Sequence, residues 1–282
     1  MDLLAFSFLG LEGDGAVTFL LLGSLSAALV SMGKTGFGGS IGMLAVPILI
    51  YACGRDSVQA IGLMLPLLIF CDLVGLFLWW RKWDSRIVAI LLPGAVIGAS
   101  LGGLVLWLIQ RAKPSGQWTG SEVAGAWLNL IIGSIALGFV ILGIIRALRS
   151  KPMTFKPVFW QGTIFGGLAS LTSTIAHAGG PITTMYFLPQ RLTKDRYVAS
   201  SVLYYAVGNQ LKILPYFFLG MLNRNVLAAS VPLLPAVIAG ALLGVFLHKR
   251  IGQANFNVIV YFLLALAGVD LVTKAGGVLW FQ

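Results

Sequence analysis

The chain has 282 residues, of which 58% are hydrophobic and only 10% are charged, and its mean hydropathy is +0.94. This balance excludes an ordinary soluble domain, which needs far more polar surface, and it indicates that lipid is the solvent. The formal net charge of +10 does not call for a nucleic-acid partner, because basic cytoplasmic loops of a membrane protein explain it.

The predicted elements are long apolar helices, because only helices and closed barrels satisfy their backbones in lipid. A barrel needs alternating segments of about 10 residues, whereas residues 126–148 are apolar nearly throughout. In chain order we expect spans at residues 16–33, 57–80, 86–109, 123–148, 157–176, 196–219, 225–247 and 255–273. Two shorter apolar segments, 36–53 and 179–189, each follow a span and are interrupted by glycine and proline. We therefore predict an all-α polytopic membrane protein.

The two interrupted segments correspond to each other. At an offset of 141, "GFGGSIGMLAVP" matches "HAGGPITTMYFLP", and at an offset of 142 "PGAVIGASLGG" matches "PAVIAGALLGV". Two matches at nearly one offset indicate an internal duplication. We predict two membrane repeats, residues 1–150 and 151–282, each with a helix, a glycine-broken and possibly re-entrant segment, and three long helices.

The distribution of basic residues predicts the orientation of the repeats. If each first helix and its broken segment together cross the membrane an even number of times, one side carries twelve of the 19 Lys and Arg residues and the other five, with Lys34 and Lys212 inside the membrane. A single crossing gives eight against nine. The positive-inside rule favours the first arrangement. It implies inverted repeats in the cytoplasmic (inner) membrane with both termini outside.

Glycine-broken helices in inverted repeats are typical of secondary transporters, which bind substrate where half-helix ends meet near the midplane. We expect helix N-termini at Gly38–Gly39 and Gly179–Gly180, where free N–H groups approach an anion. Few carboxylates lie nearby in the sequence, which favours an anionic substrate. The predicted substrate-binding residues are Lys34, Gly38, Gly39, Ser40, Thr172, Ser173, Thr174, His177, Gly179, Gly180, Asn209 and Lys212.

Close helix packing is the alternative explanation for paired glycines. We assign that role to the small-residue rows Gly94, Gly98 and Gly102 and Gly240 and Gly244.

Charged residues inside spans mark functional pathways, because they are costly there. Lys212 shares a helix face with Asn209, and Asp72 occupies almost the equivalent place in the first repeat. We predict that Lys212 contacts the anion and that Asp72 serves proton coupling or gating. A structural ion pair between Lys212 and Asp72 is the alternative. His177 is either a group that titrates near neutral pH or a hydrogen-bonded buried histidine.

The motifs "GFGGSIGMLAVP", "GLASLTSTIAHAGGPITTMYFLP" and "ASSVLYYAVGNQLKILPYFFLG" resemble the TauE/SafE family of sulfite exporters over nearly the whole chain. The resemblance implies movement of sulfite, sulfoacetate and related sulfur-containing anions without ATP, driven by an ion gradient. The sequence departs from the family pattern at Ser40, where a third glycine or a proline is usual, and in the extra Lys34.

We therefore predict a secondary transporter that exports sulfite by alternating access, with the lipid bilayer and a small sulfur anion as its partners. The alternatives are a passive anion channel and an importer of a related organosulfonate. Only two histidines and no HExxH motif are present, which argues against an enzyme. Cys53 and Cys71 have no CxxC spacing, so we expect no metal site, and we expect no cofactor.

Overall fold

The computed structural model describes residues 14–39, 42–54, 57–111 and 158–279, and within 130–145 the residues 130, 133–134, 137–138, 140–141 and 144–145. All regular elements of these residues are helical. Their bounds are α1 Asp14–Phe37, α2 Gly42–Ala52, α3 Ser57–Leu78, α4 Ser85–Arg111, α6 Phe159–Ala176, α7 Gly180–Phe187, η3 Leu188–Gln190, α8 Lys194–Phe218, α9 Arg224–Ser230, η4 Val231–Leu233, α10 Leu234–Arg250 and α11 Gln253–Leu279.

The all-α membrane class is confirmed. Four helical stretches are long and apolar enough to cross a bilayer, namely Gly15–Phe37, Val58–Leu78, Ser85–Leu108 and Arg224–Arg250. The long helices α6, α8 and α11 also lie where spans were expected. The expected span 123–148 lies mostly outside the described residues, and those of its residues that are described are helical.

Large apolar side chains cover the outside of the helix bundle. Phe77 and Phe218 are 79% and 76% exposed, and many leucine and isoleucine side chains are more than half exposed. Such a surface would be unfavourable in water, but hydrocarbon solvates it.

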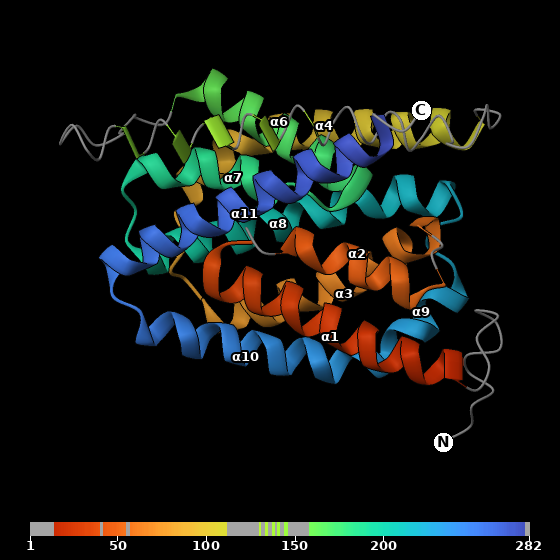
Figure 1. The fold of residues 1–282 in the computed structure, drawn as a ribbon. Helices are drawn as coiled ribbons and strands as arrows, with labels where there is room; N and C mark the ends of the chain where they lie inside the picture. The colour runs from red at the N-terminus through yellow and green to blue at the C-terminus, as the bar shows by residue number, and fades with distance from the viewer. Residues whose placement is uncertain are drawn as a thin grey trace.

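The helices pack in the order α6, α4, α8, α3, α10, α1, with α1 and α10 at one side of the bundle and α4 and α6 at the other (Figure 1). The offset of 141 to 142 residues makes α1 the counterpart of α6, α3 that of α8, and α4 that of α10. If each helix is exchanged for its counterpart, the same packing order results, read from the opposite side of the bundle. Helix α1 thus packs on α10, and its counterpart α6 packs on α4, the counterpart of α10.

The central helices α3 and α8 run antiparallel. Gly62, near the start of α3, lies against Met221, just beyond the end of α8, whereas Gly75, near the end of α3, lies against Val202 in the first half of α8. Two sequence-equivalent helices thus point in opposite directions.

Small residues bring the backbones of the outer helix pairs together. A Cβ atom at Gly94 or Gly98 would overlap the backbone of α6, and one at Gly240 or Gly244 would overlap the backbone of α1. The packing role predicted for these rows is confirmed.

The two short helices α2 and α7 do not reach across a bilayer. Their 11 and 8 residues extend only about 16 and 12 Å at 1.5 Å per residue, against a hydrocarbon core of about 30 Å. The Ser26 hydroxyl of α1 donates to the Ala45 carbonyl of α2 at 2.7 Å, so α2 turns back beside α1.

Candidate functional site

The first chain break follows α1. Gly38 and Gly39 have φ values of 69° and 93°, a left-handed conformation that favours glycine. The Gly39 N–H donates to the Gly33 carbonyl at 3.0 Å, which closes the C-terminal turn of α1. The expected helix N-terminus at Gly38–Gly39 is therefore wrong: these glycines end one helix, and the next begins at Gly42. A Gly-Gly pair suits either end of a helix, so the pattern did not decide between them. Ser40 lies outside the described residues.

The second chain break has a different construction. Here α6 ends at Ala176, and the left-handed residue is His177, with φ 52°. Gly179 has φ −72° and precedes α7, which begins at Gly180 with Pro181 in its first turn. The expected helix start at Gly179–Gly180 is confirmed. The first N–H groups of α7 point out of its end, as they do in any helix.

A chain of buried polar contacts joins the two breaks across the α3–α8 pair. Lys34 of α1 forms an ion pair with Asp72 of α3. Asn209 of α8 donates to the other oxygen of Asp72 at 2.6 Å and accepts from Lys212 at 2.8 Å. Lys212 also donates to the Ser173 hydroxyl of α6 at 2.7 Å. All of these charged groups are at least 96% buried.

These contacts correct one alternative drawn from the sequence. Asp72 is paired with Lys34, and Asn209 stands between Asp72 and Lys212. The cluster therefore holds two ammonium groups and one carboxylate, which leaves one formal positive charge in excess. Such a charge is unfavourable in low dielectric unless an anion accompanies it.

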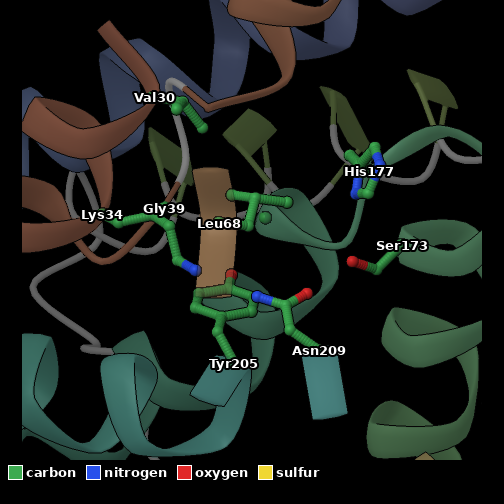
Figure 2. A pocket seen from close by; sticks show the side chains of 9 residues that line it. Val30, Lys34, Gly39, Leu68, Ser173, His177, Tyr205 and Asn209 are labelled. Carbon is green, nitrogen blue, oxygen red and sulfur yellow. The ribbon is translucent and has the colours of Figure 1, made fainter. Parts of the chain in front are cut away.

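The breaks and the polar chain enclose a small cavity of about 30 Å³. Its lining is formed by Val30, Lys34, Gly39, Leu68, Ser173, His177, Gly180, Tyr205 and Asn209. Figure 2 shows Lys34 and Gly39 on one side and Ser173 and His177 on the other, with Tyr205 and Asn209 between them. The cavity is small in this conformation.

Six of the predicted substrate-binding residues line the cavity: Lys34, Gly39, Ser173, His177, Gly180 and Asn209. Lys212 lies behind the wall and reaches it through Ser173 and Asn209. The other described members of the prediction are placed elsewhere. The Thr172 and Thr174 hydroxyls donate to carbonyls of their own helix, and Gly38 and Gly179 pack against Tyr197 and against Ala169 and Ser173.

Tyr205 is a site residue that the prediction omitted. Its ring lies beneath the Lys34 ammonium, 5.1 Å from the ring centroid to Nζ, a favourable cation–π arrangement. Its hydroxyl contacts the Thr183 hydroxyl of α7 and lies 3.4 Å from the Gly38 carbonyl. The available signal was its position four residues before Asn209, on the same helix face.

A second polar cluster lies near the first break, at the ends of α3, α8 and α10. The two ring nitrogens of His248 face the Gly36 carbonyl at 3.0 Å and the Asp195 carboxylate at 2.9 Å. Lys82 contacts the same carboxylate at 2.9 Å. Asp195 is in the first turn of α8, and its side chain is partly exposed. Burial alone would raise the pKa of Asp195, but the hydrogen bonds from Lys82 and His248 outweigh it and hold the pKa below its ordinary value.

The sequence was compared with known proteins and families. No match was found among curated proteins, nor among solved structures. One family model matches, described as sulfite exporter TauE/SafE, and the match covers residues 20–271. This range includes both breaks, the polar chain and all residues that line the cavity. The chain therefore belongs to the sulfite exporter TauE/SafE family.

Proposed function

We propose that this protein exports sulfite across the cytoplasmic (inner) membrane as a secondary transporter that works by alternating access. The family makes the chain a membrane transporter of sulfur-containing anions rather than an enzyme. In the proposal, the anion occupies the cavity between the two breaks. Lys34, Ser173, His177 and the backbone at Gly39 and Gly180 surround it, and Lys212 supplies positive charge through Ser173 and Asn209.

One observation carries this proposal: the cavity is backed by two buried ammonium groups and a single carboxylate. The excess positive charge favours an anion over a neutral or cationic substrate. The start of α7 at Gly180 adds N–H groups and the positive end of a helix dipole. Asp72, held between Lys34 and Asn209, is then a coupling or gating group whose protonation would release Lys34.

The proposed mechanism uses two inverted repeats, residues 1–150 and 151–282, with both termini outside. The antiparallel directions of α3 and α8, and the exchange-symmetric packing order, support this relation. Alternating access then consists of one helix group rocking against the other around a fixed central site. The small volume of the cavity favours a site that holds one small anion over a wide, open channel.

Transport assays test the function directly. In proteoliposomes we expect sulfite flux that depends on an imposed pH gradient and that Lys212→Met lowers by at least about 30-fold, since losing a buried charge contact costs about 2 kcal/mol or more. Lys249→Met is the matched control, because it removes a cation from the exposed end of α10 and should leave flux unchanged. Flux indifferent to the pH gradient would favour the passive channel, and equal flux in Lys212→Met would remove Lys212 from the site.

Cysteine labelling tests the topology in a background without Cys53 and Cys71. The exposed positions Lys249 and Asn223 lie at opposite ends of the α9–α10 segment. An impermeant reagent added outside should label Asn223→Cys and spare Lys249→Cys. The reverse pattern would place both termini in the cytoplasm, and labelling of neither or both variants would contradict a membrane crossing by this segment.

A further inference from the structure

The hydrogen on the His177 ring is fixed by its neighbours. Nε2 of His177 lies 3.0 Å from the Ile61 carbonyl oxygen, which can only accept a hydrogen bond. The Tyr216 hydroxyl is 3.4 Å from the same nitrogen, but it donates its own hydrogen to the Thr174 carbonyl at 2.7 Å. Nε2 must therefore carry the hydrogen in this arrangement.

The other ring nitrogen of His177 has no partner. Nδ1 is fully buried and makes no hydrogen bond to any described residue, although the ring lines the cavity (Figure 2). In the neutral ring with hydrogen on Nε2, Nδ1 presents a lone pair. A buried acceptor without a donor is unfavourable. A ligand that donates a hydrogen bond to Nδ1 would remove this cost.

The charged and titratable groups around the ring do not supply that donor. Lys212 donates to Ser173 and Asn209, and Lys34 is paired with Asp72. The Asp72 carboxylate takes hydrogen bonds from Lys34 and Asn209, and the Tyr216 hydrogen goes to Thr174.

The cavity wall also contains a hydroxyl donor, Ser173. Because Lys212 donates to the Ser173 oxygen, the Ser173 hydroxyl keeps its own hydrogen for an acceptor. The cavity thus combines positive charge, a hydroxyl donor and a fixed nitrogen acceptor. A fully deprotonated oxyanion would pair with the positive charge and accept the Ser173 hydrogen. It would also place a lone pair opposite the lone pair of Nδ1, which would leave Nδ1 without a donor.

We propose that the site selects an oxyanion that still carries one proton, hydrogensulfite in this case, whose hydrogen is donated to Nδ1 of His177. This inference rests on the proposed function, since it specifies the ionic form of the same substrate. The proton enters and leaves with the anion, so each transport event carries one hydrogen and one negative charge. Sulfate, which has no proton at neutral pH, is excluded by the same atom.

Binding measurements on the purified full-length protein test this. We would measure the affinities of sulfite, sulfate and methanesulfonate at pH 6 and pH 8 by calorimetry, with oxygen excluded. We expect sulfite to bind at pH 6 about tenfold more tightly than at pH 8, and about tenfold more tightly than sulfate, because an unpaired buried acceptor opposes the unprotonated forms. Methanesulfonate is a monoanion without a hydrogen to donate, so it should bind weakly, and its pH profile reports titration of the protein alone.

His177→Asn sharpens the test, because asparagine tolerates the left-handed conformation at this position and its amide presents a donor as readily as an acceptor. We expect this variant to lose most of the preference for sulfite over sulfate. Tyr216→Phe, which leaves Nδ1 unchanged, should keep it.

The outcomes separate the two claims. If sulfite binds but sulfate or methanesulfonate binds as tightly at pH 6, or if methanesulfonate shows the same pH profile as sulfite, the selection by protonation state is wrong and the transport proposal stands. If His177→Asn folds and keeps the full preference, His177 is not the selecting group. If no sulfur anion binds at either pH, the proposed function itself fails.

Discussion

The two chain breaks share a Gly-Gly pair in the sequence but are built differently. At the first, both glycines adopt positive φ and close the end of α1. At the second, the positive φ falls on His177, and Gly179 has an ordinary φ of −72° and gives clearance to the Ala169 carbonyl. At the second break, the residue that turns the backbone therefore also carries a side chain that lines the cavity. At the first break, the turn is made by residues without side chains.

The polar groups that each break contributes differ in the same way. The first brings Lys34, whose charge is neutralised by Asp72, and the second brings Ser173 and His177 with Lys212 behind them. We propose that the first break mainly holds structure and that the second mainly presents binding groups. The following predictions test this division, from the largest expected effect to the smallest.

The largest effect is expected for Lys34→Met, which leaves Asp72 buried without its ion-pair partner. Breaking a buried pair in this way costs about 3–5 kcal/mol, so the thermal midpoint in detergent should fall steeply. The double variant Lys34→Met with Asp72→Asn should recover most of that stability, because no uncompensated charge remains. Thermal melts followed by size-exclusion chromatography measure both.

Lys212→Met is the comparison for that experiment. It removes hydrogen bonds but no ion pair, so we expect a stability loss of only about 1–3 kcal/mol together with loss of transport. Equal destabilisation by Lys34→Met and Lys212→Met would abolish the division between a structural and a binding break.

An intermediate loss of stability is expected when the glycines of the two breaks are replaced by alanine. In Gly39→Ala the residue keeps a positive φ, which costs about 1–2 kcal/mol, and its Cβ would lie 2.7 Å from Cε2 of Tyr205, adding about 1–3 kcal/mol of overpacking. Gly179→Ala meets only the overlap, with the Ala169 carbonyl oxygen at 2.6 Å. Gly54→Ala meets only the conformational cost, since Gly54 has φ 65° and open space around it. Melting curves should rank Gly39→Ala as the most destabilised, and a smaller loss than in Gly179→Ala would refute the account of the first break.

The smallest effect is expected at Asp195, which reaches the first break through His248. The Asp195 pKa is lowered in the folded protein, so its contribution to stability is present above the ordinary carboxyl pKa and disappears as the pH falls through the folded value. Asp195→Asn should therefore lower stability by no more than about 1 kcal/mol at neutral pH, because this cluster is partly exposed. Below about pH 4 the wild type should converge on the variant. A deficit of the same size at pH 3 and pH 7 would show that the carboxylate charge contributes nothing.

Much of the fold followed from patterns that act along one helix. Span length, the repeat offset and the small-residue rows predicted the helices and the packing glycines. The breaks were located because glycine and proline interrupt apolar runs in corresponding places.

The pairing of side chains did not follow from the sequence. Lys212 and Asp72 occupy nearly equivalent positions in antiparallel helices, yet Asn209 meets Asp72, and Lys34 reaches it from a different helix. Which side chain pairs with Asp72 depends on how α1, α3 and α8 pack against each other. The spacing of residues along a single helix does not contain that information. Thr172 does not line the cavity, and the reason is local: a threonine inside a helix can satisfy its hydroxyl with the carbonyl one turn earlier, as it does here.

The ion pair between Lys34 and Asp72 also bears on how the chain is assembled. Its members are 38 residues apart, and both belong to the first repeat, so the pair can form as soon as α3 has been synthesised. Each charge alone raises the insertion free energy of its helix by about 2.5–3.5 kcal/mol, and early pairing relieves both. Asn209 and Lys212 arrive more than 130 residues later. Helices α1 and α3 can thus remain in the bilayer with this pair of charges neutralised, and Lys212 joins the cluster only when α8 has been synthesised.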